Sequence, residues 1–262
     1  MTGSKAEATI RAANASRAGA LVGYLPIGYP DLATSIEAAI TLTQHGVDML
    51  ELGLPYSDPV IDGPTIQAAT TKALENGFRL RHAFEAVREI SAASDAPILC
   101  MTYFNPVLSY GVDRFAADLA EAGGAGLITP DLVPEEAGEW LAASAAHDLD
   151  RVFLAAPTSS EARLRRATEL SRGFTYVVST MGITGARSDV DERARGLVER
   201  LREVSDRPLA VGIGISTGAQ VADVLTYADG AIVGSRLVTA LGDGIDALAD
   251  VADGLAEGTR RG

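Results

Sequence analysis

Residues 47–67 read VDMLELGLPYSDPVIDGPTIQ, and they join a short apolar strand to a helix through a stiff loop. The apolar residues before Glu51 are typical of a buried strand, whereas the prolines and glycines between Gly53 and Pro64 exclude regular structure there. The loop carries a second acid, Asp62, just before the expected helix. One carboxyl at the end of a strand and another on the following loop favour general acid–base chemistry.

The same unit recurs along the chain, because short apolar runs alternate with longer amphipathic stretches. Strands that are apolar at nearly every position are typical of parallel sheets buried on both faces. Eight such strands, each followed by a helix, predict a (β/α)8 TIM barrel within the 262 residues. The expected strands are residues 20–25, 47–52, 98–103, 126–129, 151–155, 176–179, 209–212 and 230–233.

Helices are expected between these strands, with two additions. Residues 2–16 would form an N-terminal capping helix over the bottom of the barrel, and residues 79–91 would be an extra helix after the second strand. No linker rich in Pro, Gly or Ser divides the chain, so one domain over residues 1–262 is predicted. The other expected helices are residues 32–45, 64–76, 112–122, 134–147, 161–171, 192–204, 218–227 and 242–256.

The composition excludes several classes of function. A net charge of −13 argues against nucleic acids and anionic membrane surfaces, although backbone amides can still bind a small anion. The one cysteine, Cys100, excludes an intrachain disulfide and fits a small core residue. Residues 1–17 lack the apolar centre of a signal peptide, and no apolar run approaches the ~18 residues of a membrane span. A cytoplasmic location is expected.

Active sites of TIM barrels lie at the carboxyl ends of the strands, and two kinds of residue gather there in this chain. Glycine turns at residues 212–216 and 233–235, together with Gly185, predict a phosphate site made of backbone amides. Glu51 is expected to be buried and to have a raised pKa, which suits proton donation near neutral pH. Asp62, taken alone, fits a turn before Gly63 equally well.

No metal site is expected, since the three histidines, His45, His82 and His147, fall within or at the ends of predicted helices. They therefore lie away from the carboxyl ends of the strands, and no Ser-His-Asp or Cys-His set can be assembled from them. For Glu51, the alternative to catalysis is a structural carboxylate at the end of the strand that is hydrogen-bonded to the backbone.

The chain resembles the tryptophan synthase alpha subunit family over essentially its whole length. The matching stretches are ELGLPYSDP at 51–59, DGPTIQ at 62–67, MTYFNP at 101–106, Pro130-Asp131, GITGAR at 182–187, VGIGIS at 211–216 and VGS at 233–235. The first two are highly specific, whereas the glycine turns are supportive only. Residues 26–30 read PIGYP, which departs from the Thr-x-Gly-Asp-Pro of much of the family.

The resemblance implies an aldol-type lyase that splits indole-3-glycerol phosphate into indole and glyceraldehyde 3-phosphate. It assigns to Glu51 the protonation of indole C3 and help in removing the proton of the glycerol hydroxyl. It assigns to Asp62 the indole N–H and the positive charge that develops on the ring. A fixed carboxylate is most valuable there as that charge appears.

The resemblance also implies the ligand contacts. Phosphate would be bound by amides of Gly185, Gly214, Ile215, Gly234 and Ser235, and the indole slot would be lined by Tyr24, Met101, Ile128, Tyr176 and Ile213. Thr184, in a loop that closes over the substrate, would contact Asp62.

The family's partner is a beta subunit, in an alpha2-beta2 heterotetramer, to which indole passes through a tunnel. The resemblance places pyridoxal phosphate in that subunit and no cofactor in this chain. Tyr29, Pro55, Ser57 and Asp58 are expected on loops that face the beta subunit.

Three other functions are compatible with parts of this pattern. A stand-alone lyase of the same fold would act without a beta subunit. A sugar-phosphate isomerase would need acids at the ends of the first and fifth strands, where this chain has Tyr24 or Pro26 and Ala156 or Pro157. A docking subunit without catalysis is disfavoured because the acids and glycine turns are present.

Overall fold

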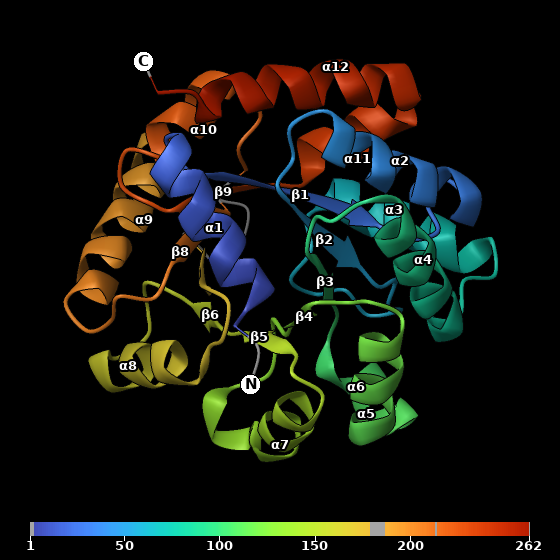
Figure 1. The fold of residues 1–262 in the computed structure, drawn as a ribbon, viewed down its shortest axis with the longest axis horizontal. Coiled ribbons are helices and arrows are strands. Elements are labelled where there is room, and N and C mark those ends of the chain that lie inside the picture. Colours follow the sequence, from blue (N-terminus) through green and yellow to red (C-terminus); the bar gives the residue numbers. More distant parts are fainter. Residues whose placement is uncertain (1–2, 179–186, 213, 262) are drawn as a thin grey trace.

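The computed structural model describes residues 3–178, 187–212 and 214–261, with strands at the centre and helices around them (Figure 1). Neighbouring strands pair in parallel, in the order β5-β4-β3-β2-β1-β9-β8-β7-β6. The strands are β1 (Ala20–Pro26), β2 (Met49–Gly53), β3 (Ile98–Met101), β4 (Gly126–Ile128), β5 (Asp150–Val152), β6 (Leu154–Ala155), β7 (Thr175–Val178), β8 (Leu209–Gly212) and β9 (Gly230–Val233).

The barrel closes at its fifth strand, which is divided into β5 and β6 at Phe153. β5 pairs with β4 and β6 pairs with β7, so β5 and β6 stand at the two ends of the strand order. Because they are consecutive pieces of one strand, they close the sheet into a barrel. The Phe153 amide donates to Ser171 Oγ at 3.3 Å instead of continuing the ladder, and Arg151 forms an antiparallel bridge with Arg172. The predicted TIM barrel is confirmed, with nine strand segments where eight strands were expected.

Most helices lie where the sequence predicts them, and the capping helix and the extra helix after β2 are present as α1 and α4. The helices are α1 (Lys5–Ser16), α2 (Leu32–Gln44), α3 (Pro64–Glu75), α4 (Leu80–Ala93), α5 (Phe104–Tyr110), α6 (Val112–Glu121), α7 (Gly138–Ala146), α8 (Glu161–Leu170), α9 (Arg187–Arg202), α10 (Gly218–Val224), α11 (Ser235–Gly242) and α12 (Ile245–Ala256), with 3-10 turns η1 (Pro134–Glu136) and η2 (Glu257–Thr259).

Several predicted bounds are wrong. The helix expected over 242–256 begins at Ile245, because Gly242 ends a separate helix, α11, that starts directly after β9. The helix expected over 134–147 begins as η1 and becomes α-helical at Gly138. The third strand ends at Met101 rather than at residue 103, because α5, which was not predicted, begins at Phe104.

The start of α5 depends on a residue far away in the sequence. The Phe104 amide donates to both carboxyl oxygens of Asp131, at 2.9 and 3.1 Å. Asp131 lies on the loop after β4, so it caps a helix that follows β3. The cap satisfies an amide that the first turn of a helix leaves without an internal partner.

Side chains that point into the barrel form one apolar cluster, and α1 closes it from below. Inward positions alternate along each strand. The cluster combines α1 with residues of nearly every strand: Ala6, Ile10, Ala13, Ala20, Val22, Met49, Leu99, Ala125, Ile128, Val152, Phe174, Ala210 and Ile232.

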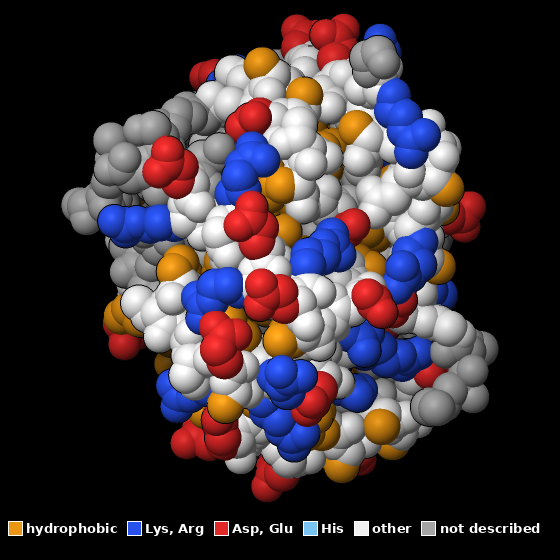
Figure 2. Space-filling view, turned by 90° about the vertical axis from the view of Figure 1, so that its left-hand side faces the viewer, with side chains coloured by type: hydrophobic (Ala, Val, Ile, Leu, Met, Phe, Trp, Pro, Cys, Tyr) orange, Lys and Arg blue, Asp and Glu red, His pale blue; other side chains and the backbone are white. Residues whose placement is uncertain are grey.

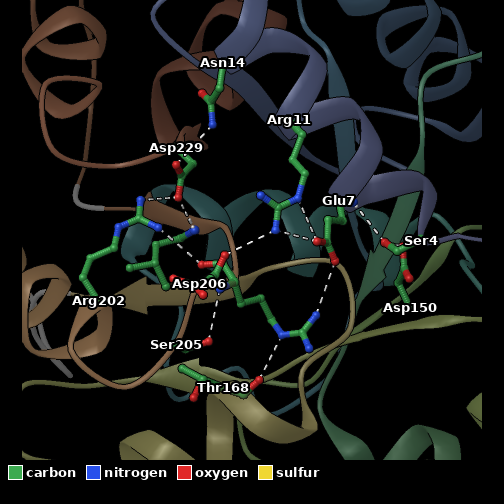
Figure 3. A network of polar contacts seen from close by, with 12 residues as sticks. Ser4, Glu7, Arg11, Asn14, Asp150, Thr168, Arg202, Ser205, Asp206 and Asp229 are labelled. Carbon is green, nitrogen blue, oxygen red and sulfur yellow. Dashed lines mark hydrogen bonds and ion pairs between the residues drawn. The ribbon is translucent and has the colours of Figure 1, made fainter.

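Polar contacts hold α1 across the amino-terminal ends of the strands (Figure 3). Ser4 Oγ donates to Asp150 Oδ2 at 2.8 Å, and Asn14 Nδ2 donates to Asp229 Oδ1 at 3.1 Å. Asp150 is the first residue of β5 and Asp229 directly precedes β9. This end of the barrel is therefore sealed, and the opposite end is left for the site.

The face that carries α8 and α9 shows acidic and basic side chains interspersed (Figure 2). Arg200 pairs with Glu161 at 2.6 Å and Arg163 with Glu135 at 3.7 Å, so neighbouring charges on this face partly neutralise each other. None of the helices in the described ranges has the length and apolar character that crossing a bilayer requires.

Candidate active site

Glu51 is the third residue of β2, and its Cα pairs with that of Tyr24 on β1, so both side chains point into the barrel. The Glu51 side chain is buried, and Oε2 has no hydrogen-bond partner in the described part of the chain. Burial, followed by the charge of Asp62, raises the pKa of Glu51 from 4.5 to about 8. At neutral pH this carboxyl is therefore largely protonated and able to donate a proton.

Asp62 lies on the loop between β2 and α3, beside the Gly63 N-cap of that helix. Tyr103 holds the loop from below, since its Oη accepts the Ile61 amide at 2.9 Å. Gln67 Nε2 donates to the Asp62 carbonyl at 2.9 Å. Partial burial raises the pKa of Asp62 from 3.8 to about 6, so the carboxyl is mostly ionised at neutral pH. The two acids therefore differ in charge at the same pH, which is the arrangement that acid–base catalysis needs.

Two tyrosines, Tyr24 of β1 and Tyr176 of β7, lean across the next strand of the barrel in the same way. A Cβ at Gly53 would lie 2.2 Å from the Tyr24 hydroxyl, and a Cβ at Gly212 would lie 2.6 Å from the Tyr176 hydroxyl. Each glycine lies two residues beyond the register partner of its tyrosine. Burial, with the neighbouring carboxyls, raises the pKa of both phenols well above 10, so both stay protonated.

A cavity of about 210 Å³ opens between these groups at the carboxyl ends of the strands. Glu51 and Asp62 both line it, and so do both tyrosines. The full lining consists of Tyr24, Glu51, Ile61, Asp62, Gly63, Ile66, Met101, Leu154, Tyr176, Val178, Gly212, Gly214, Ile232, Gly234 and Ser235.

Most of the site residues expected from the sequence meet at this cavity. Eight of them line it: Tyr24, Glu51, Asp62, Met101, Tyr176, Gly214, Gly234 and Ser235. Ile128 and Ile215 do not line it. Ile128 is fully buried in the inner apolar cluster against Met101, and Ile215 lies in the outer core between strands and helices. Thr184, Gly185 and Ile213 lie outside the described residues.

Gly212 belongs to the glycine turn predicted at 212–216, and Gly63 to the expected turn after Asp62. The remaining lining residues were not predicted. Leu154, Val178 and Ile232 are strand residues with inward positions, and the strand periodicity contained that signal once the strand bounds were known. Ile61 and Ile66 flank Asp62, and Ile66 contacts the cavity from the first turn of α3. Because these residues lie on or next to an irregular loop, their spacing in the sequence did not predict that they face the cavity.

Two helices begin beside the glycine turns, and they differ in how side chains cap the backbone at their starts. At α10 the Gln220 side chain accepts the amides of Ser216 and Thr217, at 2.7 and 3.2 Å. At α11 the N-cap is Gly234, which offers no side-chain cap, and Ser235 faces the cavity. The first amides of a helix have no internal partner and attract anions, so α11 is the better place for a phosphate.

The described residues contain no group of three or more His, Cys, Asp or Glu side chains suited to a metal ion. The histidines lie at helix ends, as predicted: His45 pairs with Asp253 at 3.1 Å, and His82 Nδ1 accepts the Arg79 amide at 3.1 Å. They are not among the residues that line the cavity.

The fold and the cavity together define a TIM-barrel enzyme whose pocket holds one protonated and one ionised carboxyl. Comparison with known proteins specifies the family. A family profile described as tryptophan synthase alpha chain matches residues 10–260, and this chain belongs to that family.

Individual relatives agree with this assignment. A tryptophan synthase alpha chain of Leifsonia xyli subsp. xyli is 64% identical over 255 residues, which cover 97% of this chain and 98% of the relative. One from Nocardia farcinica is 54% identical over 252 residues, covering 96% and 94%. A solved structure of Mycobacterium tuberculosis tryptophan synthase matches with a TM-score of 0.94 and 52% identity, over 100% of both chains.

Proposed function

We propose that this chain cleaves indole-3-glycerol phosphate to indole and glyceraldehyde 3-phosphate, as the alpha subunit of a tryptophan synthase. The observation that carries the proposal is the meeting of Glu51 and Asp62, with different charges, in one cavity beside the start of α11. Family membership over residues 10–260 supports the reaction, and the stand-alone alternative is less favoured.

In this proposal Glu51 donates its proton to indole C3, which makes C3 tetrahedral and places positive charge on the ring nitrogen. Asp62 accepts the ring N–H and stabilises that charge. The Glu51 carboxylate then takes the proton of the hydroxyl next to C3 as the carbon–carbon bond breaks. The bonding electrons return to the ring, so indole and the aldehyde are released and Glu51 is protonated again.

The phosphate is proposed to bind at the start of α11, on the amides of Gly234 and Ser235, with Gly214 nearby. Gly214 has φ +74°, a conformation that favours glycine. Gly185 and Ile215 from the adjacent loops complete the proposed phosphate set. The indole ring is proposed to lie between Tyr24, Tyr176 and Met101, with Ile213 and Ile128 around it, and Thr184 is proposed to contact Asp62 when substrate is bound.

The proposed partner is a tryptophan synthase beta subunit, which would carry the pyridoxal phosphate, so that no cofactor belongs to this chain. Large exposed apolar side chains support a docking surface beside the cavity, on the segments that follow β2, β3 and β4: Val60, Leu108 and Val133. Ser57 and Asp58 are exposed and Tyr29 is half-buried, so these three would lie at the same surface, whereas Pro55, which was expected there, is buried. One domain over residues 1–262 and a cytoplasmic location complete the proposal.

The test is an assay of indole release from indole-3-glycerol phosphate by the purified chain, with and without a beta subunit. Substrate-dependent release that rises strongly on adding the beta subunit is expected. Release that the beta subunit leaves unchanged would favour the stand-alone lyase.

Glu51→Gln is the first variant to measure. It keeps the shape of the side chain and removes the proton it transfers, so kcat is expected to fall by roughly 10²–10⁴ while substrate binding is nearly kept. Rapid-quench turnover and equilibrium binding of the substrate measure the two quantities separately. A loss of less than about tenfold would remove Glu51 from the acid–base role.

A further inference from the structure

A second, much smaller cavity lies beside the main one and shares Tyr24, Asp62 and Met101 with it. The space that the centre of a water molecule can occupy in it is about 10 Å³. This volume is about what a single water molecule requires, and it is far too small for an organic ligand. The cavity is lined by Tyr24, Gly53, Leu54, Asp62, Thr70, Met101, Thr102, Tyr103 and Pro130.

Thr102 is the residue in this lining whose polar group has no partner among the described residues. Its side chain is buried, and Oγ1 has no hydrogen-bond partner within the described ranges. A buried hydroxyl left unpaired costs roughly 1–3 kcal/mol, and such groups are nearly always satisfied by protein or by ordered water. Thr70 differs, because its hydroxyl already bonds the carbonyls of Ile66 and Gln67 in its own helix, at 3.0 and 3.1 Å.

The other polar groups of the lining can complete the shell of a water. Tyr103 Oη accepts the Ile61 amide at 2.9 Å, which leaves the Tyr103 hydroxyl proton free to donate elsewhere. The Tyr24 hydroxyl lies over Gly53, which also lines the cavity. The Asp62 carboxyl accepts hydrogen bonds when ionised. A buried water usually makes about three hydrogen bonds, and these residues offer that number.

We propose that one water molecule occupies this cavity and bridges the Thr102 hydroxyl to the Asp62 carboxylate, with the tyrosine hydroxyls as its other partners. Thr102 is then a positioning residue, which acts through the water on the group that is to hold the indole N–H. The positioning role of Thr102 rests on the proposed function, whereas the existence of the water site does not.

The bridge has a consequence for the charge of Asp62. A water that donates to the carboxylate favours the ionised form, so its loss raises the pKa of Asp62. The titratable groups that face Asp62 are Glu51 from β2, Tyr24 from β1, Tyr103 after β3 and Tyr176 from β7. Removing the Thr102 hydroxyl changes none of these four side chains.

The experiment compares Thr102→Val with Thr70→Val in the full-length chain. Each variant keeps the size of the side chain and removes one hydroxyl that lines the cavity, but only the first removes the proposed bridge. The Asp62 carboxyl is titrated by ¹³C NMR. In Thr102→Val the midpoint is expected to move to higher pH by roughly 0.5–1, and in Thr70→Val it is expected to stay.

A high-resolution crystal structure provides the second measurement. Electron density for a water within hydrogen-bond distance of Thr102 Oγ1 and the Asp62 carboxyl is expected in the unaltered chain and not in Thr102→Val. Tyr24→Phe, which removes a different partner, gives a second NMR comparison if Thr102→Val folds poorly. Identical titrations of the two threonine variants, or a cavity without water density, would overturn the proposal. Neither measurement needs turnover, so failure of the proposed reaction would be recognised separately.

Discussion

At the scale of single residues, burial assigns different protonation states to Glu51 and Asp62. Both are acids on or after the same strand, yet Glu51 is enclosed inside the barrel and Asp62 is only partly covered. Desolvation disfavours the charged form, and it acts more strongly on the enclosed group. The pKa of Glu51 is raised to about 8 and that of Asp62 to about 6.

These pKa values predict a bell-shaped pH dependence of kcat/KM for indole release. Activity should rise as pH increases through about 6, because Asp62 must lose its proton, and fall above about 8, because Glu51 must keep its own. Initial rates in the presence of the beta subunit test this. In Asp62→Asn the acidic limb should be absent from any residual activity. A profile that keeps rising beyond about pH 9 would contradict the assignment of Glu51 as the acid.

A second residue-scale prediction concerns the space beneath Tyr24. In Gly53→Ala the new methyl would lie 2.2 Å from the Tyr24 hydroxyl, so the ring must move within the cavity. We expect kcat/KM for the substrate to fall roughly 10- to 100-fold, since small displacements of positioning groups have effects of this size. Gly138→Ala is the control, because its Cβ would meet nothing within 4 Å. Unchanged kinetics in Gly53→Ala would show that the Tyr24 ring position is unimportant.

At the scale of elements, close packing decides where helices begin and end. The helix α10 starts at Gly218 directly against α12 and η2: a Cβ at Gly218 would lie 2.3 Å from the Gly254 carbonyl oxygen, and a Cβ at Gly258 would lie 2.1 Å from the Gly218 carbonyl oxygen. Glycines therefore let these backbones approach. The sequence showed the glycines but not which backbone each of them faces.

Two glycine-to-alanine changes on helices should act in opposite directions. Gly218→Ala should destabilise the fold by about 1–3 kcal/mol, because backbone must move to admit the methyl. Gly196→Ala, inside α9 with nothing within 4 Å, should stabilise it by about 0.5–1 kcal/mol, since alanine is the better helix former. Chemical denaturation of the full chain measures both. Shifts of the same sign would contradict the contrast between a crowded Gly218 and an open Gly196.

At the scale of the whole molecule, the two ends of the barrel have separate tasks. The amino-terminal end is closed by α1 and its contacts to Asp150 and Asp229 (Figure 3). The carboxyl end holds the cavity with both acids. The inner apolar cluster lies between them, so a change at the amino-terminal end is expected to alter stability more than catalysis.

Ile10→Ala tests this separation. Ile10 is fully buried between α1 and the strands, and removing its methyl groups should cost about 2–5 kcal/mol of unfolding free energy. The kcat of the folded enzyme should stay near that of the unaltered chain, because the change is at the far end from Glu51. Lys5→Ala, on the exposed side of the same helix, should change stability by less than about 0.5 kcal/mol. A large fall in kcat for Ile10→Ala would show that the two ends are coupled.

Periodicity and local motifs predicted the barrel, its capping helix, the burial of Glu51 and the glycine turn at Gly234, whereas the role expected for Asp62 came from the family resemblance. These features depend on burial patterns and backbone freedom that neighbouring residues specify. The cap of α5 by Asp131, the paired Tyr24–Gly53 and Tyr176–Gly212 contacts, and the raised pKa of Asp62 could not be predicted in this way. Each arises where strands distant along the chain are brought within a few ångströms, and only the closed sheet sets those distances.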